Sequence, residues 1–162
     1  MALFRTRTAV GAGVLATLIL VLAFGNQAFT EWVINHANRQ TVWGWFLHML
    51  SWPAWAFGPA DDSGAAAREL LARDLRALLL LVFVALVLGV AAKSIGAGSA
   101  AFIVGWAALV FASALAAFAT AFITADASLL GAFGAAAGGS AYGLFVGWIA
   151  GIAVAGSKTT AA

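Results

Sequence analysis

Long apolar stretches alternate with short polar connections along this chain, and four of the stretches are long enough to cross a membrane as helices. About 20 helical residues span the hydrocarbon core of a bilayer. The central parts of the four stretches contain no Asp, Glu, Lys, Arg or His, which is typical of helices embedded in lipid. The pattern predicts an all-α integral membrane protein, a single membrane domain over residues 1–162, with four transmembrane helices at residues 8–25, 75–92, 98–123 and 129–156.

The composition agrees with a membrane location. The chain is 64% hydrophobic and 9% charged, with a mean hydropathy of +1.03, outside the range of soluble domains. The net charge of +2 comes from few and scattered basic residues, so we expect no nucleic-acid partner. The absence of cysteine excludes disulfides, thiolate metal sites and iron–sulfur clusters. A chain this rich in alanine and glycine suits high-GC bacterial coding, and we expect a bacterial plasma membrane.

Charged residues sort into two groups, which predicts the orientation. One side holds Arg5, Arg7, Lys93 and Lys158 without any acid, and the other side holds all six acids with four arginines. The positive-inside rule makes the first side cytoplasmic, so both termini are predicted to be inside (N-in/C-in). The first 25 residues also fit a signal peptide with Ala23-Phe24-Gly25 as a cleavage site, but we expect them to be retained as the first span.

Residues 26–74, between the first two spans, are predicted to form an extracytoplasmic, Trp-rich helical cap. Residues 41–52 read as an apolar helix ended by Pro53, too short to cross the bilayer, with Thr41, Gly44, His48 and Ser51 in one narrow polar strip. Tryptophan prefers the headgroup level. The interfacial anchors are therefore predicted to be Trp43, Trp45, Trp52 and Trp55.

A second helix is predicted to begin at Asp62 or Ser63 and to continue into the second span. Its arginines sit at the level of lipid phosphates, which a guanidinium can bind bidentately. Possible lipid headgroup contacts are therefore Arg68, Arg73 and Arg76. The alternative is a solvated face that includes a Glu69–Arg73 pair at i,i+4 spacing.

Small residues recur at every fourth position of the last span: Ala135, Gly139, Gly143, Gly147, Gly151 and Ala155. Such a stripe lets two helix backbones approach closely in lipid, so we expect a helix-packing surface or partner interface. One candidate neighbour is the small stripe of the third span, Ala108, Ala112, Ala116 and Thr120. A single crossing helix is expected to cover only two or three of the five turns, which would leave the remainder for another helix or a lipid.

Few side chains in the predicted spans or the cap could take part in catalysis or bind a metal. The intramembrane polar residues, expected to hydrogen-bond to their own helix or between helices, are Thr17, Ser113, Thr120, Ser140 and Tyr142. His36 and His48 are the only candidates for acid–base or metal chemistry, and their spacing matches no motif with a mechanism. We therefore expect no catalytic residue, no metal and no cofactor.

Together these features predict a non-enzymatic accessory or structural subunit of a larger membrane protein complex. It would dock through small-residue helix faces and the aromatic cap. We expect its partners to be other integral membrane subunits, with a homo-oligomer as the alternative, together with membrane lipids. Two other functions stay open: a homo-oligomeric channel or small uncoupled permease, and a lipid-binding or lipid-modifying protein.

Overall fold

The computed structural model describes residues 2–57, 64–91, 96, 98–124 and 127–159. Over these residues the chain is all-helical, without strands, as predicted. Three helices, α4, α5 and α6, are each long and apolar enough to cross a membrane, and the bent pair of α1 and α2 counts as a fourth if it is one span. The helices are α1 (Ala2–Phe24), α2 (Gln27–His36), α3 (Val42–Leu50), α4 (Gly64–Ala91), α5 (Ser99–Thr120), α6 (Leu129–Val146) and α7 (Trp148–Thr159).

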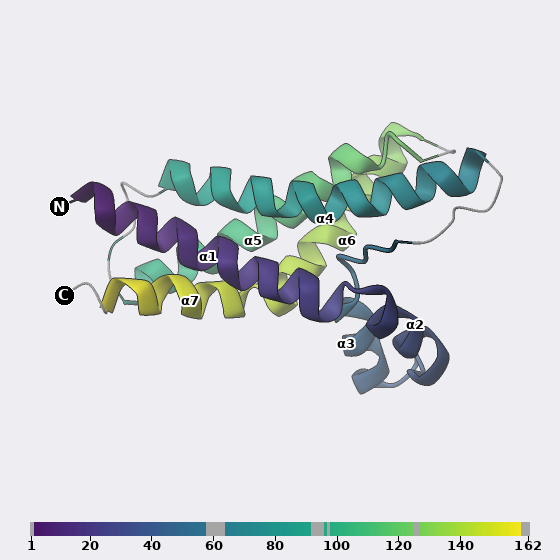
Figure 1. Ribbon diagram of the computed structural model, residues 1–162, viewed down its shortest axis with the longest axis horizontal. Coiled ribbons are helices and arrows are strands. Elements are labelled where there is room, and N and C mark those ends of the chain that lie inside the picture. Colours follow the sequence, from purple (N-terminus) through teal and green to yellow (C-terminus); the bar gives the residue numbers. More distant parts are fainter. Residues whose placement is uncertain (1, 58–63, 92–95, 97, 125–126, 160–162) are drawn as a thin grey trace.

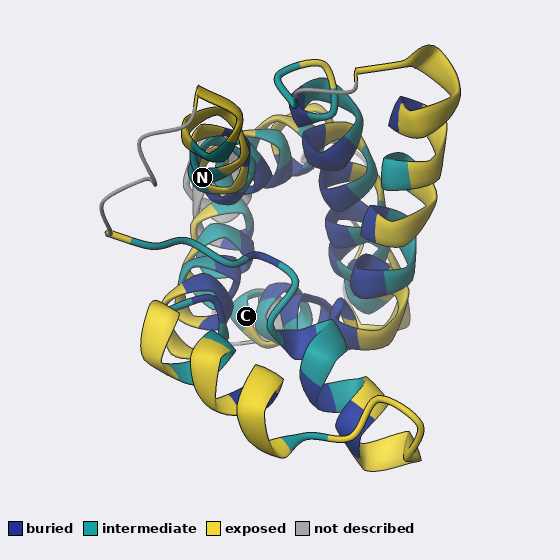
Figure 2. Cartoon of the chain, turned by 90° about the vertical axis from the view of Figure 1, so that its right-hand side faces the viewer, coloured by how far each residue is buried: buried dark blue, intermediate teal, exposed yellow. Residues whose placement is uncertain are grey.

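Four helices pack in a ring in which α4 lies between α1 and α5, and α7 closes the ring between α5 and α1. The two ends of the chain lie together at one end of the molecule, and α2 and α3 lie at the other (Figure 1). Figure 2 looks along the ring from that α2–α3 end, with buried residues on the inward sides of the helices. At Gly13 an added Cβ would collide with Leu88 of α4 and would lie 3.2 Å from Val154 Cγ2 of α7, so three helices meet closely at this point.

The second predicted span lies within one continuous helix, as expected from the sequence. Helix α4 runs for 28 residues, from Gly64 to Ala91. The predicted capping residues, Asp62 and Ser63, lie outside the described residues. Its buried face consists of Ala72, Ala77, Leu80, Val84 and Leu88, at the spacings of three, four and five residues expected for a single helix face.

The fourth predicted span, residues 129–156, is wrong as a single helix. The chain divides at Gly147 into α6 and α7, and Figure 1 shows it changing direction there. The backbone bonding is kept through the break, because Gly147 N–H donates to Gly143 O at 2.8 Å and Gly151 N–H donates to Gly147 O at 2.9 Å. The change of direction allows both α6 and α7 to stay in contact with α5.

The prediction missed α2 and the corner before it. Helices α1 and α2 meet at 55°, and the side chain of Asn26 joins them. Its Nδ2 donates to Leu22 O at 3.0 Å and to Ala23 O at 2.8 Å, while its Oδ1 accepts from Phe29 N at 2.9 Å. One amide therefore satisfies free carbonyls at the end of α1 and a free N–H at the start of α2, both of which need partners.

The short apolar helix predicted at residues 41–52 is α3, Val42–Leu50. Thr41 caps it, since its Oγ1 accepts from Gly44 N at 3.0 Å. The buried positions are Gly44, Leu47 and Leu50. Part of the predicted polar strip thus faces protein, because Gly44 packs against the backbone of Asn38.

Candidate functional site

The glycines of the last span form a seam with α5 of the same chain. We call Gly139, Gly143, Gly147 and Gly151 the glycine seam, and all four are buried. A Cβ at Gly139 would lie 3.1 Å from the Cβ of Ala117, one at Gly147 would lie 2.6 Å from Trp106 Cδ1, and one at Gly151 would lie 2.7 Å from Phe102 O. The four positions are therefore filled by a neighbouring helix within the chain, and the two ends of the predicted stripe, Ala135 and Ala155, are only half-buried.

The seam uses a different face of α5 from the expected one. Seam contacts go to Phe102, Trp106, Val110, Ser113 and Ala117. The alanine stripe of α5, which we expected to meet the glycines, is buried elsewhere, and its last member Thr120 lies against Arg76 of α4. The contacts with α5 run from Gly139 to Gly151, about three helical turns, which agrees with the expected coverage by a single helix. They continue across the break at Gly147.

Buried hydroxyls in the bundle are satisfied within their own helices. Thr17 donates to Gly13 O at 2.8 Å, Ser113 donates to Leu109 O at 2.7 Å, and Thr120 donates to Ala116 O at 2.8 Å. These bonds to a carbonyl one turn back confirm the structural interpretation of the three residues. Because these hydroxyls are already hydrogen-bonded, they offer little polar surface that could bind or conduct a solute.

The turn after α3 inserts a tryptophan between helices at the α2–α3 end. The Trp52 ring stacks on Tyr142 of α6, with ring centroids 4.9 Å apart and planes at 21°. The guanidinium carbon of Arg76, from α4, lies 5.4 Å from the centroid of the Trp52 ring, within the range of a cation–π interaction. We call Trp52, Tyr142 and Arg76 the aromatic cluster. It ties the α3 segment to both α4 and α6.

The three predicted headgroup arginines have different surroundings. Arg68 is exposed, and the Nε of exposed Arg73 lies 3.4 Å from Glu69 Oε1 in the expected i,i+4 pair. Arg76 instead points into the bundle, where its Nε lies 3.5 Å from Thr120 Oγ1. Within the described part of the chain no carboxylate forms an ion pair with Arg76. One sign of this was already present in the sequence, since Arg76 is the only arginine inside a predicted span.

The four predicted interfacial tryptophans also separate into two kinds. Trp43 is 67% exposed and Trp45 is 41% exposed, although Trp45 also packs edge-on against Phe145 of α6 at 5.0 Å. Trp52 and Trp55 are half-buried in the protein. Trp55 donates from Nε1 to Val21 O at 3.0 Å, and its own N–H donates to Gly25 O at 2.8 Å. These bonds fix the segment after α3 to the end of α1.

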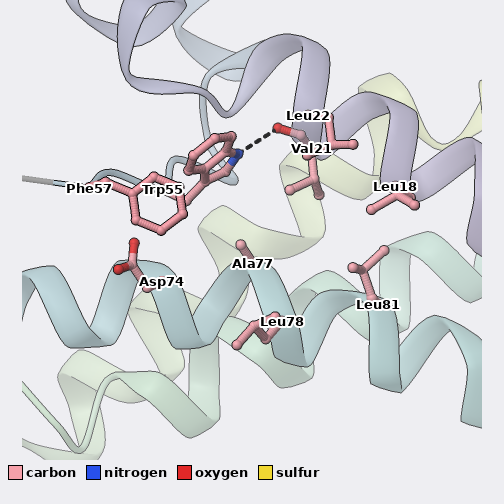
Figure 3. Close-up of a pocket in the computed structure, with 9 residues that line it drawn as sticks. All are labelled: Leu18, Val21, Leu22, Trp55, Phe57, Asp74, Ala77, Leu78 and Leu81. Carbon is pink, nitrogen blue, oxygen red and sulfur yellow. Dashed lines mark hydrogen bonds between the residues drawn. The ribbon is translucent and has the colours of Figure 1, made fainter.

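A groove of about 450 Å³ lies between α1 and α4 beside Trp55. Figure 3 shows Trp55, Phe57 and Asp74 at one end of it and Leu18 and Leu81 at the other. Asp74 is the one charged residue in the lining, and its Oδ1 accepts from Ala56 N at 3.1 Å. We call this feature the α1–α4 groove; it is lined by Leu18, Val21, Leu22, Trp55, Phe57, Asp74, Ala77, Leu78 and Leu81.

The two histidines have local structural roles. The Nδ1 of His36 lies 2.9 Å from Trp32 O and its ring stacks on Trp32, while the Nε2 of His48 lies 3.1 Å from Ala37 O. Among the described residues, no group of three or more His, Cys, Asp or Glu side chains could hold a metal ion. Chemically, the arrangement offers apolar surface, aromatic rings, one inward arginine and one groove with a carboxylate at its end.

Comparison with known proteins adds no family assignment, since no family model, no curated protein and no solved structure matches this chain. The α1–α4 groove is a feature that sequence reasoning missed. The signal available for it in the sequence was Asp74, an acidic residue immediately before an apolar span.

Proposed function

We propose that this protein is a non-enzymatic subunit of a larger membrane complex and that it docks through the outward face of the α2–α3 hairpin. The observation that carries the proposal is a set of large apolar side chains on this hairpin. Their exposed fractions run from 49% to 86% for Trp32, Ile34, Val42 and Trp43. Apolar side chains grouped outside the predicted spans mark an interaction surface.

The hairpin is placed for lateral contact. It lies to one side of the ring of helices at the α2–α3 end (Figure 1), because the 55° corner at Asn26 turns α2 away from the axis of α1. Trp55 and the aromatic cluster fix its far end. A rigid, laterally placed apolar surface favours a neighbouring membrane protein or the headgroup layer. We propose the former because aromatic side chains with low conformational entropy are enriched at protein interfaces.

The glycine seam is no longer part of the proposed docking surface. Because α5 fills the space at all four glycines, a helix from another chain has no access to them. The channel alternative also loses support, since the hydroxyls of Thr17, Ser113 and Thr120 bond to their own helices. The docking proposal therefore rests on the hairpin alone.

Crosslinking in the native membrane tests the proposal. A photoreactive amino acid at Val42, which is 86% exposed, should crosslink to one integral membrane protein in constant stoichiometry. Changing Ile34→Glu together with Trp43→Glu should abolish the crosslink and the co-purification, because charge is costly at an apolar contact. Gln40→Glu is the matched control, since it adds charge to the same exposed hairpin without removing apolar surface.

Crosslinks to lipid only, or a complex that survives the double change, would refute the docking proposal. Crosslinks between two copies of this chain would point to the homo-oligomer instead. Orientation can be tested in the same membranes, because the chain has no cysteine and a single introduced one is a unique label. We expect Val42→Cys to react from the outside and Ser157→Cys from the cytoplasm.

A further inference from the structure

We propose that the α1–α4 groove binds one acyl chain of a membrane phospholipid whose headgroup carries a primary ammonium, as in phosphatidylethanolamine, and that the Asp74 carboxylate contacts that ammonium. The proposal goes beyond docking, since it needs no partner protein. It rests on the shape of the groove, on its polarity from one end to the other, and on the unpaired charge of Asp74.

The apolar part of the groove fits a hydrocarbon chain. Its volume of about 450 Å³ lies within the range of small-ligand sites, roughly 300–1,000 Å³. From Asp74 to Leu81 the groove follows two turns of α4, about 10 Å along the helix axis. Leu18 and Leu22 line the opposite side on α1. Inside a bilayer, an apolar groove open between two spans is filled by an acyl chain unless protein covers it.

The polar end of the groove lies where a headgroup would be. Asp74 directly precedes the predicted span that begins at residue 75, and it is half-exposed. The hydrogen bond from Ala56 N uses one lone pair of Oδ1, and a carboxylate can accept several more bonds. Among the described residues no basic side chain forms an ion pair with Asp74. An ammonium group complements this charge and can donate three hydrogen bonds, as a Lys ammonium does.

Trp55 and Phe57 give the polar end a fixed shape. Their rings pack edge to face with centroids 5.2 Å apart, and the bond from Trp55 Nε1 to Val21 O holds the indole across the end of α1 (Figure 3). An indole at this position also suits the membrane interface, where tryptophan is enriched. The groove is therefore open along its apolar length and bounded at the headgroup end.

The test uses the full chain in nanodiscs that contain equal amounts of phosphatidylethanolamine and phosphatidylcholine. Trace amounts of each lipid carry a photoreactive group in the acyl chain, and labelled peptides are identified by mass spectrometry. We expect labelling at Leu18, Leu22 or Leu81, with phosphatidylethanolamine preferred by up to about fivefold, which is the contribution of an exposed ion pair. Choline has no N–H to donate, so phosphatidylcholine serves as the matched lipid control.

Two kinds of variant separate the chain contact from the headgroup contact. Asp74→Asn keeps an oxygen for Ala56 N but removes the charge, and it should bring the ratio between the two lipids to one. Leu78→Trp fills the groove and should lower labelling by both lipids by about tenfold, because the indole takes the space of the chain. Leu86→Trp is its control, since Leu86 is similarly exposed on α4, 57% against 61% for Leu78, but does not line the groove.

Equal labelling by both lipids in the native chain would overturn the proposal, as would full labelling in Leu78→Trp. A peptide crosslink in place of lipid, from a photoreactive residue at Leu78, would also overturn it by showing protein in the groove. Circular dichroism reports whether each variant folds. If Leu78→Trp does not fold, Leu22→Trp fills the same groove from α1 at a position that is 54% exposed, and the same outcomes apply to it.

Discussion

At the glycine seam α6 and α7 contribute no side chain to the contact with α5, whereas at the α2–α3 end large aromatic rings fill the contact. A Cβ at Gly143 would lie 2.7 Å from Ser113 Oγ, so the seam has no room for an added atom. The aromatic cluster is held by ring stacking at 4.9 Å and a cation over a ring. The first contact is sensitive to added atoms, and the second is sensitive to their removal.

This difference has a physical origin in the membrane setting. Lipid chains are as apolar as leucine, so helices in lipid associate through close packing and hydrogen bonds rather than through hydrophobic burial. A seam of glycines maximises backbone contact along the spans. At the α2–α3 end, indole and guanidinium groups can pair an apolar body with a polar contact. Trp52 and Trp55 do this at the point where the chain leaves α3.

The largest expected loss of stability comes from adding a side chain to the glycine seam. Gly143→Ile should lower the free energy of unfolding by about 3 kcal/mol or more, because the new atoms collide with the backbone of Val110 and cannot be relieved by a rotamer change. Reversible unfolding in mixed detergent measures the loss. Gly138→Ile is the control: it lies on the same helix with open space around it, and its effect should stay within about 0.5 kcal/mol. Equal losses at the two positions would show that the loss does not come from the seam.

The next largest loss of stability comes from removing an aromatic ring from the aromatic cluster. Trp52→Ala should cost about 2 kcal/mol, roughly half the loss for a fully buried tryptophan, because Trp52 is half-buried. Trp43→Ala removes the same side chain from a position that is 67% exposed and should be nearly neutral in the same unfolding assay. A larger loss at Trp43 than at Trp52 would contradict the inward placement of Trp52.

The corner between α1 and α2 should contribute less to the free energy of unfolding than the glycine seam or the aromatic cluster. Asn26→Ala removes a cap and two further hydrogen bonds, with an expected cost of about 1–2 kcal/mol. Hydrogen exchange should speed up in α2 and stay unchanged along the seam. Asn35→Ala, at an exposed position on the same helix, controls for the change in composition. Unchanged exchange in α2 would mean that Trp55 and the aromatic cluster hold the hairpin without the Asn26 bonds.

The smallest effect is the coupling within the aromatic cluster. A double-mutant cycle of Arg76→Gln and Trp52→Leu should give a coupling of about 0.5–1 kcal/mol, the value expected for a cation over an indole. The parallel cycle with Arg73→Gln should give none, because Arg73 pairs with Glu69 on the exposed side of α4. Coupling of the same size in both cycles would indicate a general charge effect.

The helices themselves could be read from the sequence more readily than their contacts. Apolar length identified α4, α5 and α6 as helices long and apolar enough to cross a membrane. Thr41 and Pro53 placed the ends of α3 close to where they are. The corner at Asn26 was missed although Gly25-Asn26 combines a helix-ending glycine with an N-cap residue. The break at Gly147 could not be read, because a glycine in an apolar run fits both a continuous helix and a bent one.

Which helices contact each other depends on their arrangement in space, and the periodicity of residues along the sequence does not reveal that arrangement. The four-residue spacing showed that the last span has a bare face, but it could not show that α5 meets this face through Trp106 and Val110 instead of its alanine stripe. Likewise, Arg76 and Arg73 are only three positions apart, yet one points into the bundle and the other does not. The groove needed α1, α4 and the segment after α3 to be placed together.

The contacts of Gly13 show that the bundle can be completed only late in synthesis of the chain. Its bare backbone lies where α1 touches both Leu88 and Val154, and Val154 follows Leu88 by 66 positions in the chain. At a ribosomal rate of about 5–20 residues per second, the second neighbour is made about 3–13 seconds after the first. During that interval α1 can pair with α4 on one flank only, and its other flank faces lipid. The ring closes only when α7, made after α1, α4 and α5, returns to the first.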